Sequence, residues 1–269
     1  MPYAHKALDD INLDIKEGVI TAIIGETGSG KSTLVEHLNA LLLPDEGSLQ
    51  ILDYNIVAGQ KQKFLKPLRK DVGLVFQFSE YQLFEETVLK DVAFGPLNFG
   101  VLPDDAMKQA AEALKLVNID ESYFNRSPLE ISGGQKRRVA IAGIIACDPK
   151  IIVLDEPTAG LDPKGAKEII NLFVSLNRQL HKTIIIVSHD NEMVYNYCEE
   201  TVVLSHGQIK YHGPTLDLFA DDKLLKEYVL LEPQIVAFKN MLREKGFKIS
   251  KEARTIEMVV KEVAGQMKK

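Results

Sequence analysis

Two glycine-containing segments, far apart in the chain, carry groups that bind phosphate. The first is the run Gly25, Glu26, Thr27, Gly28, Ser29, Gly30, Lys31, Ser32 and Thr33. The second is the run Ser132, Gly133, Gly134 and Gln135, which precedes the apolar stretch 151–154 and the carboxylates of Asp155 and Glu156. The first segment alone indicates that the chain binds a nucleoside triphosphate. The two together predict that two chains close face to face over ATP.

The first segment fits the pattern G-x-x-x-x-G-K-[ST]. It lies between a β-branched run at 19–24 and a helical pattern at 31–43, which is the context that this pattern requires. Its glycines let backbone N–H groups point inward, and the following helix directs the positive end of its dipole at the phosphates. We expect Lys31 to bridge the β- and γ-phosphates and Ser32 to coordinate Mg²⁺.

The two carboxylates after the apolar stretch have different expected roles. Asp155 ends a strand, so its side chain emerges at the carboxyl edge of the sheet, where it suits Mg²⁺. Glu156 follows at once and is the candidate that orients and deprotonates the attacking water. The alternative for both is a pair of acids that cap a strand.

The second glycine segment opens a predicted helix at 134–147. Small residues and N–H groups at a helix start form an anion site, whereas the plainer interpretation is a serine N-cap followed by flexible glycines. The basic run Lys136, Arg137 and Arg138 is expected to be a solvated face rather than a nucleic-acid patch.

Two further polar residues follow predicted strands. His189 comes after strand 183–187, where sites of parallel sheets collect, and it is expected to hydrogen-bond the γ-phosphate and the water. Gln77 ends strand 72–76 and can reach Mg²⁺ or the water, although a plain polar strand end would look the same. The remaining histidines lack such a context: His5, His37, His181, His206 and His212.

Strands that alternate with helices predict an α/β layer with a mostly parallel sheet, closed by an antiparallel hairpin at 201–204 and 208–211. Stretch 77–100 shows no clean period. Residues 214–269 are rich in Leu, Lys and Glu with helical spacing, and they are expected to form a small helical or mixed extension.

Composition limits the class of protein. The 269 residues are 45% hydrophobic and 26% charged, as in ordinary globular proteins, and the net charge of −6 argues against a nucleic-acid binder. No apolar run approaches the ~18 residues of a membrane span, so we expect any membrane role to act through a protein partner. Cys147 and Cys198 form no close-spaced pair and are expected to be thiols in a reducing cytoplasm.

Residues 7–212 resemble the ATP-binding subunit of an ABC transporter. Gly25 to Ser32 matches its Walker A, Gln77 its Q-loop, Ser132 to Gln135 its signature, Asp155 and Glu156 its Walker B and catalytic glutamate, Asp162 its D-loop, and His189 its switch histidine. The resemblance implies a P-loop NTPase domain at 1–213, with a helical subdomain at about 78–147 and an antiparallel β edge. It also implies that Ser132 to Gln135 complete the pocket of an opposite subunit.

A narrower resemblance is to the energy-coupling factor ATPases of cobalt and vitamin type (CbiO-like), and to the second of their two paralogues. It rests on the runs 31–39, 75–88 and 139–143. It implies an identical or paralogous ATPase partner, a membrane scaffold subunit and a substrate-binding membrane subunit, with uptake of a vitamin or a transition-metal ion. The chain would then be peripheral on the cytoplasmic face of the cell membrane, with extension 214–269 joining two ATPases.

One departure concerns adenine. The family usually has about twenty more residues before the position of Tyr3, including a strand and an aromatic that stacks on adenine. We expect that either the start of the sequence is truncated or adenine is bound in a different way. We do not expect Tyr3 to stack on adenine.

Three alternatives stay open at this point. A soluble ABC ATPase of DNA repair would insert coiled coils between Lys31 and Ser132. A soluble ABC ATPase of translation would carry two tandem ATPase units, and a P-loop kinase would not need Ser132 to Gln135.

The aromatics Phe78, Tyr81 and Phe84 either form a docking face for a membrane subunit or pack inside a helical subdomain.

Overall fold

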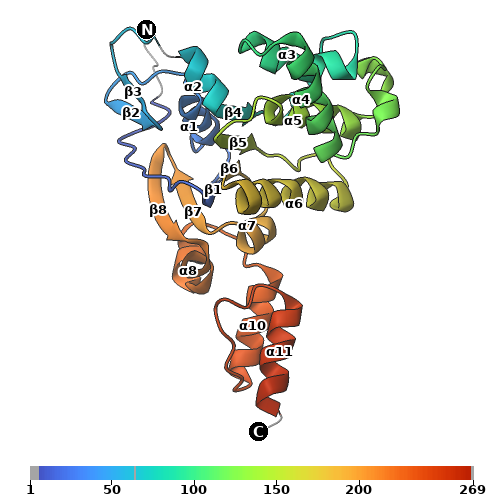
Figure 1. Cartoon of the computed structure of the whole chain (residues 1–269). Coiled ribbons are helices and arrows are strands. Elements are labelled where there is room, and N and C mark those ends of the chain that lie inside the picture. Colours follow the sequence, from blue (N-terminus) through green and yellow to red (C-terminus); the bar gives the residue numbers. More distant parts are fainter. Residues whose placement is uncertain (1–5, 64, 268–269) are drawn as a thin grey trace. The chain divides into compact units, whose positions relative to one another are not determined.

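The computed structural model describes residues 6–63 and 65–267, so Tyr3 and His5 lie outside the described part. The chain divides into two compact units. Unit 1 joins the described residues up to Ile15 with Val19–Lys31 and those from Ser188 onward. Unit 2 comprises Lys16–Gly18 and Ser32–Val187. Figure 1 shows the elements of both.

Unit 2 contains a parallel sheet in the order β4 (Val72–Val75), β5 (Ile151–Asp155) and β6 (Thr183–Val187). These strands are short, mostly apolar runs with almost wholly buried side chains, as expected for strands covered on both faces. Because the strands are parallel, their carboxyl ends share one edge. The helices α2 (Leu65–Asp71) and α6 (Pro163–Leu180) belong to the same unit.

A group of helices occupies the middle of unit 2. It includes α3 (Val88–Asn98), α4 (Pro103–Leu116) and α5 (Gly133–Ile145), which pack against one another (Figure 1). Of the short 3-10 helices, η1 (Ser79–Gln82) precedes α3, whereas η2 (Glu121–Tyr123) and η3 (Pro128–Glu130) connect α4 with α5. The sequence pattern missed α3. Its local start signal is Thr87, whose side chain accepts a hydrogen bond from the Lys90 N–H.

Helix α1 (Lys31–Leu38) ends earlier than the expected residue 43. Ala40 has a left-handed backbone (φ 53°), and the Leu41 N–H bonds back to the Glu36 carbonyl at 2.8 Å. This turn satisfies carbonyls of the last helical turn and stops the helix before Pro44. The antiparallel pair β2 (Ser48–Ile51) and β3 (Tyr54–Val57) follows.

Unit 1 is built on β1 (Ile20–Ile24), which pairs in parallel with β7 (Glu200–Ser205). The strand β8 (Gln208–Pro214) pairs with β7 in antiparallel fashion. The prediction of an α/β fold with parallel strands and an antiparallel edge is therefore confirmed. The short helix α7 (Asn191–Tyr197) precedes β7.

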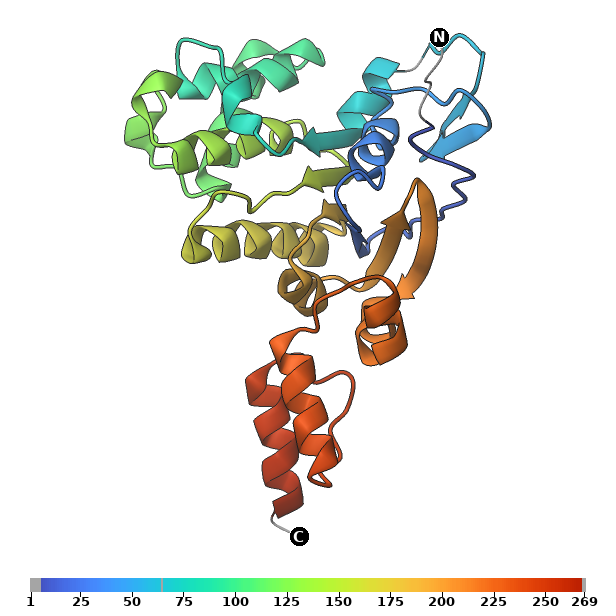
Figure 2. The same cartoon turned by 180° about the vertical axis from the view of Figure 1, so that it is seen from behind.

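The C-terminal extension, residues 214–269, is helical in its described part. It contains α8 (Thr215–Ala220), α9 (Asp222–Glu227), α10 (Gln234–Glu244) and α11 (Ile256–Met267). Helices α10 and α11 lie side by side in both views (Figures 1 and 2). In the residues that the structure describes, no helix combines the length and apolarity needed to cross a bilayer.

Arg137 overturns the expectation of a solvated basic face at 136–138. Only 2% of Arg137 is exposed. Its guanidinium donates hydrogen bonds to the carbonyls of Gln77 (2.7 Å), Glu156 (2.6 Å) and Pro157 (2.9 Å). Arg137 lies one helical turn before the buried Ile141, so it shares the inward face of α5. In the sequence, Arg137 lies within a run of basic residues, so its four-residue spacing from Ile141 was not recognised.

We expect Arg137→Met to lower the free energy of unfolding by about 3 kcal/mol or more, because three carbonyls lose a charged donor in a buried place. Urea unfolding followed by circular dichroism measures this loss. Arg138→Met is the matched control, since Arg138 is partly exposed and bonds to Val117 and Glu168. Equal losses in the two variants would contradict the structural role of Arg137.

Candidate functional site

The loop between β1 and α1 has a backbone that only glycine permits at two positions. Gly25 has φ 148°, and a Cβ there would lie 2.0 Å from the Leu204 carbonyl oxygen. Gly30 has φ 103°, and a Cβ there would lie 2.7 Å from the Ala7 carbonyl oxygen. Contacts this short would force the backbone to shift. The loop is therefore shaped by neighbouring backbone, as in a phosphate cradle.

Hydrogen bonds hold this loop in place. The Ser29 N–H donates to the Glu26 carbonyl at 3.1 Å, and the Ser29 carbonyl accepts from the Gly207 N–H at 2.9 Å. The Lys31 ammonium donates to the carbonyls of Gly25 and Glu26, each at 2.8 Å. The ammonium thus lies over the loop, where it can meet phosphate oxygens.

The remaining residues of the cradle differ in exposure. Thr33 is half-buried, and the exposed positions are Glu26, Thr27, Gly28 and Ser32. Ser29 is buried, and its hydroxyl oxygen has no hydrogen-bond partner among the residues that the structure describes. A buried hydroxyl without a partner inside this glycine loop fits a ligand that supplies a hydrogen bond.

Unit 1 also places His189 near this loop. The Ser188 N–H donates to the Ile23 carbonyl at 3.3 Å. The segment that enters His189 therefore runs beside the end of β1, directly before Gly25. His189 itself is exposed. The cradle and His189 thus emerge at the same end of the unit 1 strands.

Glu156 has a strained backbone directly after β5. Its φ of 48° lies in the left-handed region, which is unusual for a residue other than glycine. The Glu156 N–H donates to the Val187 carbonyl at 3.0 Å, and its carbonyl accepts from Arg137. Strain of this kind persists only where surrounding contacts hold it, and it concentrates at functional sites.

Arg137 joins two of the expected site segments of unit 2, those of Gln77 and Glu156. Its guanidinium contacts the backbone of Gln77, Glu156 and Pro157, and its Nη1 lies 3.4 Å from the Glu80 carboxylate. Gln77 and Glu156 are therefore brought together around one buried charge. This residue was absent from the expected site.

Three oxygen donors expected for Mg²⁺ belong to unit 2: Ser32, Gln77 and Asp155. Asp155 ends β5, and Gln77 lies just beyond the neighbouring β4. The described residues contain no group of three or more His, Cys, Asp or Glu that could hold a metal by themselves. A site with few protein ligands suits Mg²⁺, because this ion keeps several waters and takes substrate phosphates as further ligands.

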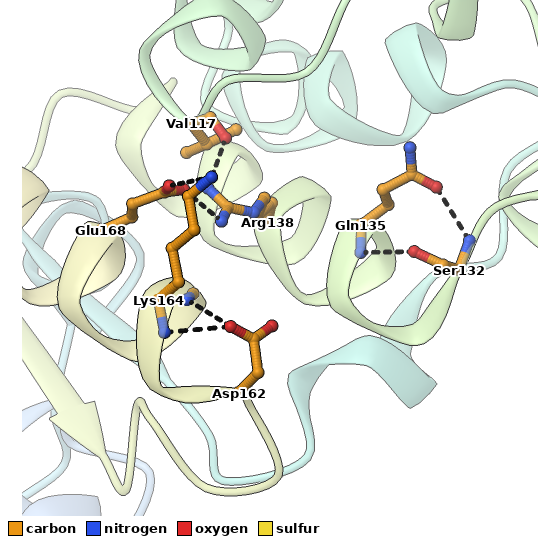
Figure 3. A network of polar contacts seen from close by, with 8 residues as sticks. Val117, Ser132, Gln135, Arg138, Asp162, Lys164 and Glu168 are labelled. Carbon is orange, nitrogen blue, oxygen red and sulfur yellow. Dashed lines mark hydrogen bonds and ion pairs between the residues drawn. The ribbon is translucent and has the colours of Figure 1, made fainter.

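Ser132 caps helix α5. Its hydroxyl accepts from the Gln135 N–H at 3.3 Å, and the Gln135 side chain accepts from the Ser132 N–H at 2.9 Å (Figure 3). The plainer interpretation of an N-cap is thus realised. Ser132, Gly133 and Gly134 are nevertheless exposed, and a Cβ on either glycine would meet no atom within 4 Å. The helix start remains open to an approaching group.

Asp162 caps helix α6 in the same manner. Its carboxylate accepts from the N–H groups of Lys164 and Gly165, each at 3.0 Å (Figure 3). The Gly165 and Lys164 N–H groups hold the pKa of Asp162 below its ordinary value, so the cap is charged at neutral pH. Asp162 is exposed.

The three aromatics after Gln77 lie at the surface. Phe78 is 56% exposed, Tyr81 83% and Phe84 64%. Phe84 packs edge to face on Phe94 at 4.9 Å between ring centroids. A groove of about 300 Å³ opens beside Phe84; among the residues lining it are Leu74, Phe84, Phe94, Phe99 and Val139. The alternative that these aromatics pack inside the helical region is wrong for Phe78 and Tyr81.

Comparison with known proteins places this geometry in a family. Residues 8–159 match the family model described as "ABC transporter". The energy-coupling factor transporter ATP-binding protein EcfA2 of Streptococcus pneumoniae (strain D39) is 52% identical over 91% of this chain and 88% of the relative. The EcfA2 of Bacillus subtilis (strain 168) is 49% identical over 97% of this chain and 95% of the relative.

Solved structures agree with these relatives. CbiO1 from Clostridium perfringens, part of the ABC transporter complex CbiONQ, superposes with a TM-score of 0.72 at 38% identity, covering 87% of this chain and 92% of that chain. A dimeric post-hydrolysis state of the ATP-binding cassette MJ0796, bound to ADP and Pi, gives a TM-score of 0.70 at 34% identity, covering 78% and 90%. The chain therefore belongs to the ABC transporter family and, within it, to the ATP-binding subunits of energy-coupling factor transporters.

Proposed function

We propose that this chain hydrolyses ATP to drive an energy-coupling factor importer. The observation that carries the proposal is the loop Gly25–Lys31, because its glycines exclude side chains and its lysine lies over the cradle. The sequence similarity to EcfA2 proteins and to CbiO1 supports the transporter assignment over a soluble ATPase of translation or DNA repair.

The residues that hold the nucleotide follow from this geometry. Backbone N–H groups of the loop and the ammonium of Lys31 bind the phosphates of ATP. Ser32, Gln77 and Asp155 would hold Mg²⁺, which neutralises charge on the β- and γ-phosphates.

Hydrolysis needs a base and a donor near the γ-phosphate. Glu156 accepts a proton from the attacking water and orients it, because its strained backbone fixes where the carboxylate starts. Gln77 assists in placing the water. His189 donates a hydrogen bond to the γ-phosphate, where negative charge spreads during phosphoryl transfer.

A second ATPase chain, identical or paralogous, completes each pocket. Ser132, Gly133, Gly134 and Gln135 would bind the triphosphate held by that partner, with Asp162 near the same boundary. Their exposure and self-contained caps support this role. ATP then favours a closed pair and hydrolysis releases it, which is a population shift driven by differential contacts. The C-terminal extension would help to join the two chains.

Coupling to the membrane requires a docking surface. The groove beside Phe84 and Phe94, with the exposed Phe78 and Tyr81, fits an apolar helix end of a membrane scaffold subunit. The chain would then lie peripherally on the cytoplasmic face of the membrane. A substrate-binding membrane subunit would select the cargo, a vitamin or a transition-metal ion.

Co-purification tests the transporter assignment directly. We expect the tagged chain, extracted from its native membranes in detergent, to bring down a second ATPase and membrane-spanning subunits identified by mass spectrometry. Recovery with ribosomes or DNA in their place would refute it.

We expect Glu156→Gln to retain ATP binding and to accumulate a closed dimer, while kcat falls at least about a hundredfold because the general base is lost. Fluorescent-nucleotide binding, size-exclusion chromatography with ATP and phosphate release measure the three properties. Glu130→Gln, an exposed acid in η3, is the control. Hydrolysis by Glu156→Gln at the wild-type rate would exclude Glu156 as the base.

We expect Ser132→Arg to leave ATP binding to its own chain intact and to lower turnover of the assembled complex at least about tenfold, because the bulky cation blocks the partner's pocket. Ser122→Arg, at an exposed serine in η2, should turn over normally. Equal turnover of the two variants would argue against a shared pocket.

A further inference from the structure

Helix α7 joins the expected γ-phosphate donor to the rest of unit 1. It has seven residues, a length that is marginal without tertiary contacts. Its N-cap is Asp190, whose carboxylate accepts from the Met193 N–H at 3.1 Å, and the Asp190 N–H donates to Ser188 Oγ at 3.1 Å. His189 therefore lies between two residues fixed by hydrogen bonds, and a movement of the first turn of α7 would move it.

The C-terminal extension holds the first turn of α7. Asn191 Nδ2 donates to the Leu231 carbonyl at 2.9 Å. The Gln234 N–H, at the start of α10, donates to the Glu192 carboxylate. Both contacts join residues two and three positions after His189 with residues of the extension.

The extension also holds the last turn of α7. Arg254 Nη1 donates to the carbonyls of Tyr195 (3.0 Å) and Cys198 (2.9 Å). A cation at these carbonyls satisfies groups that have no partner within the helix, and it complements the negative end of the helix dipole.

Lys239 adds a contact in the middle of α7. It is 2% exposed, and its ammonium donates to Tyr195 Oη (3.0 Å) and to the carbonyls of Lys251 (2.9 Å) and Ala253 (3.2 Å). Burial, with a smaller contribution from Arg243, lowers the pKa of Lys239 to about 8. The Lys239 ammonium thus links Tyr195 to the segment 251–253, which directly precedes Arg254.

These four residues, Leu231, Gln234, Lys239 and Arg254, constitute what we call the α7 brace. We propose that the α7 brace positions His189 for ATP hydrolysis, so that the C-terminal extension acts on turnover through α7. This inference rests on the proposed role of His189. The plainer alternative is that α7 is placed by its buried face alone, through Met193, Val194 and Tyr195.

A double-mutant cycle on the purified full complex separates the two alternatives. We expect Arg254→Met to lower kcat about tenfold with little change in KM for MgATP, because a displaced hydrogen-bond donor affects the transition state more than binding. Arg254→Lys should recover part of the loss. In a His189→Ala background, Arg254→Met should lower the residual kcat no further.

The matched control is Arg243→Met. Arg243 also donates to a backbone carbonyl of the extension, that of Ile249 (2.9 Å). It should lower kcat less than twofold. If the Arg254→Met complex fails to assemble, Asn191→Ala replaces it as the test variant, because it removes one hydrogen bond to Leu231. We expect Asn191→Ala to lower kcat a few-fold.

The outcomes are distinct. Equal effects of Arg254→Met in the wild-type and His189→Ala backgrounds, or equal effects of Arg254→Met and Arg243→Met, would overturn the brace while the role of His189 stands. If His189→Ala itself leaves kcat unchanged, the role of His189 and the brace both fail.

Discussion

The carbonyl oxygen of Leu204 lies where a side chain at position 25 would have to be. This steric constraint ties the phosphate cradle to the antiparallel edge of unit 1, because Leu204 belongs to β7 and the β7–β8 turn bonds to Ser29 through Gly207. The cradle is thus shaped by strands far along the chain as well as by its own glycines. The hydrogen bonds of Ser29 and Lys31 hold the loop in this shape before any phosphate arrives, which lowers the cost of ordering it on binding.

In unit 2, a buried charge fixes the positions of site segments that are far apart in the chain. Arg137 can be buried because carbonyls surround it, and those carbonyls belong to the segments of Gln77 and Glu156. Removing one partner from such a group is costly, so the arrangement tolerates little movement. The left-handed backbone of Glu156 is one product of that rigidity.

The helix starts that are expected to meet other subunits already have their own hydrogen-bonded caps. Ser132 and Asp162 each satisfy the start of their own helix, so an approaching chain meets formed helix ends. Phe78, Tyr81 and Phe84 are exposed as well, on the surface where we propose that a membrane subunit docks. In the proposed α7 brace, the contacts between the C-terminal extension and α7 would position His189.

The sequence by itself determined what depends on neighbouring residues: the cradle between β1 and α1, the carboxylates after β5, the β7–β8 hairpin and the helical extension. It failed at two local helix ends, and it failed where groups far along the chain decide. The end of α1 depends on a left-handed Ala40, and α3 on a cap at Thr87 within a stretch without a clean period. The burial of Arg137 and the hold of Arg254 on α7 depend on carbonyls 19 to 60 residues away. Only tertiary structure supplies those carbonyls, because a charged side chain is buried only where oxygen partners surround it.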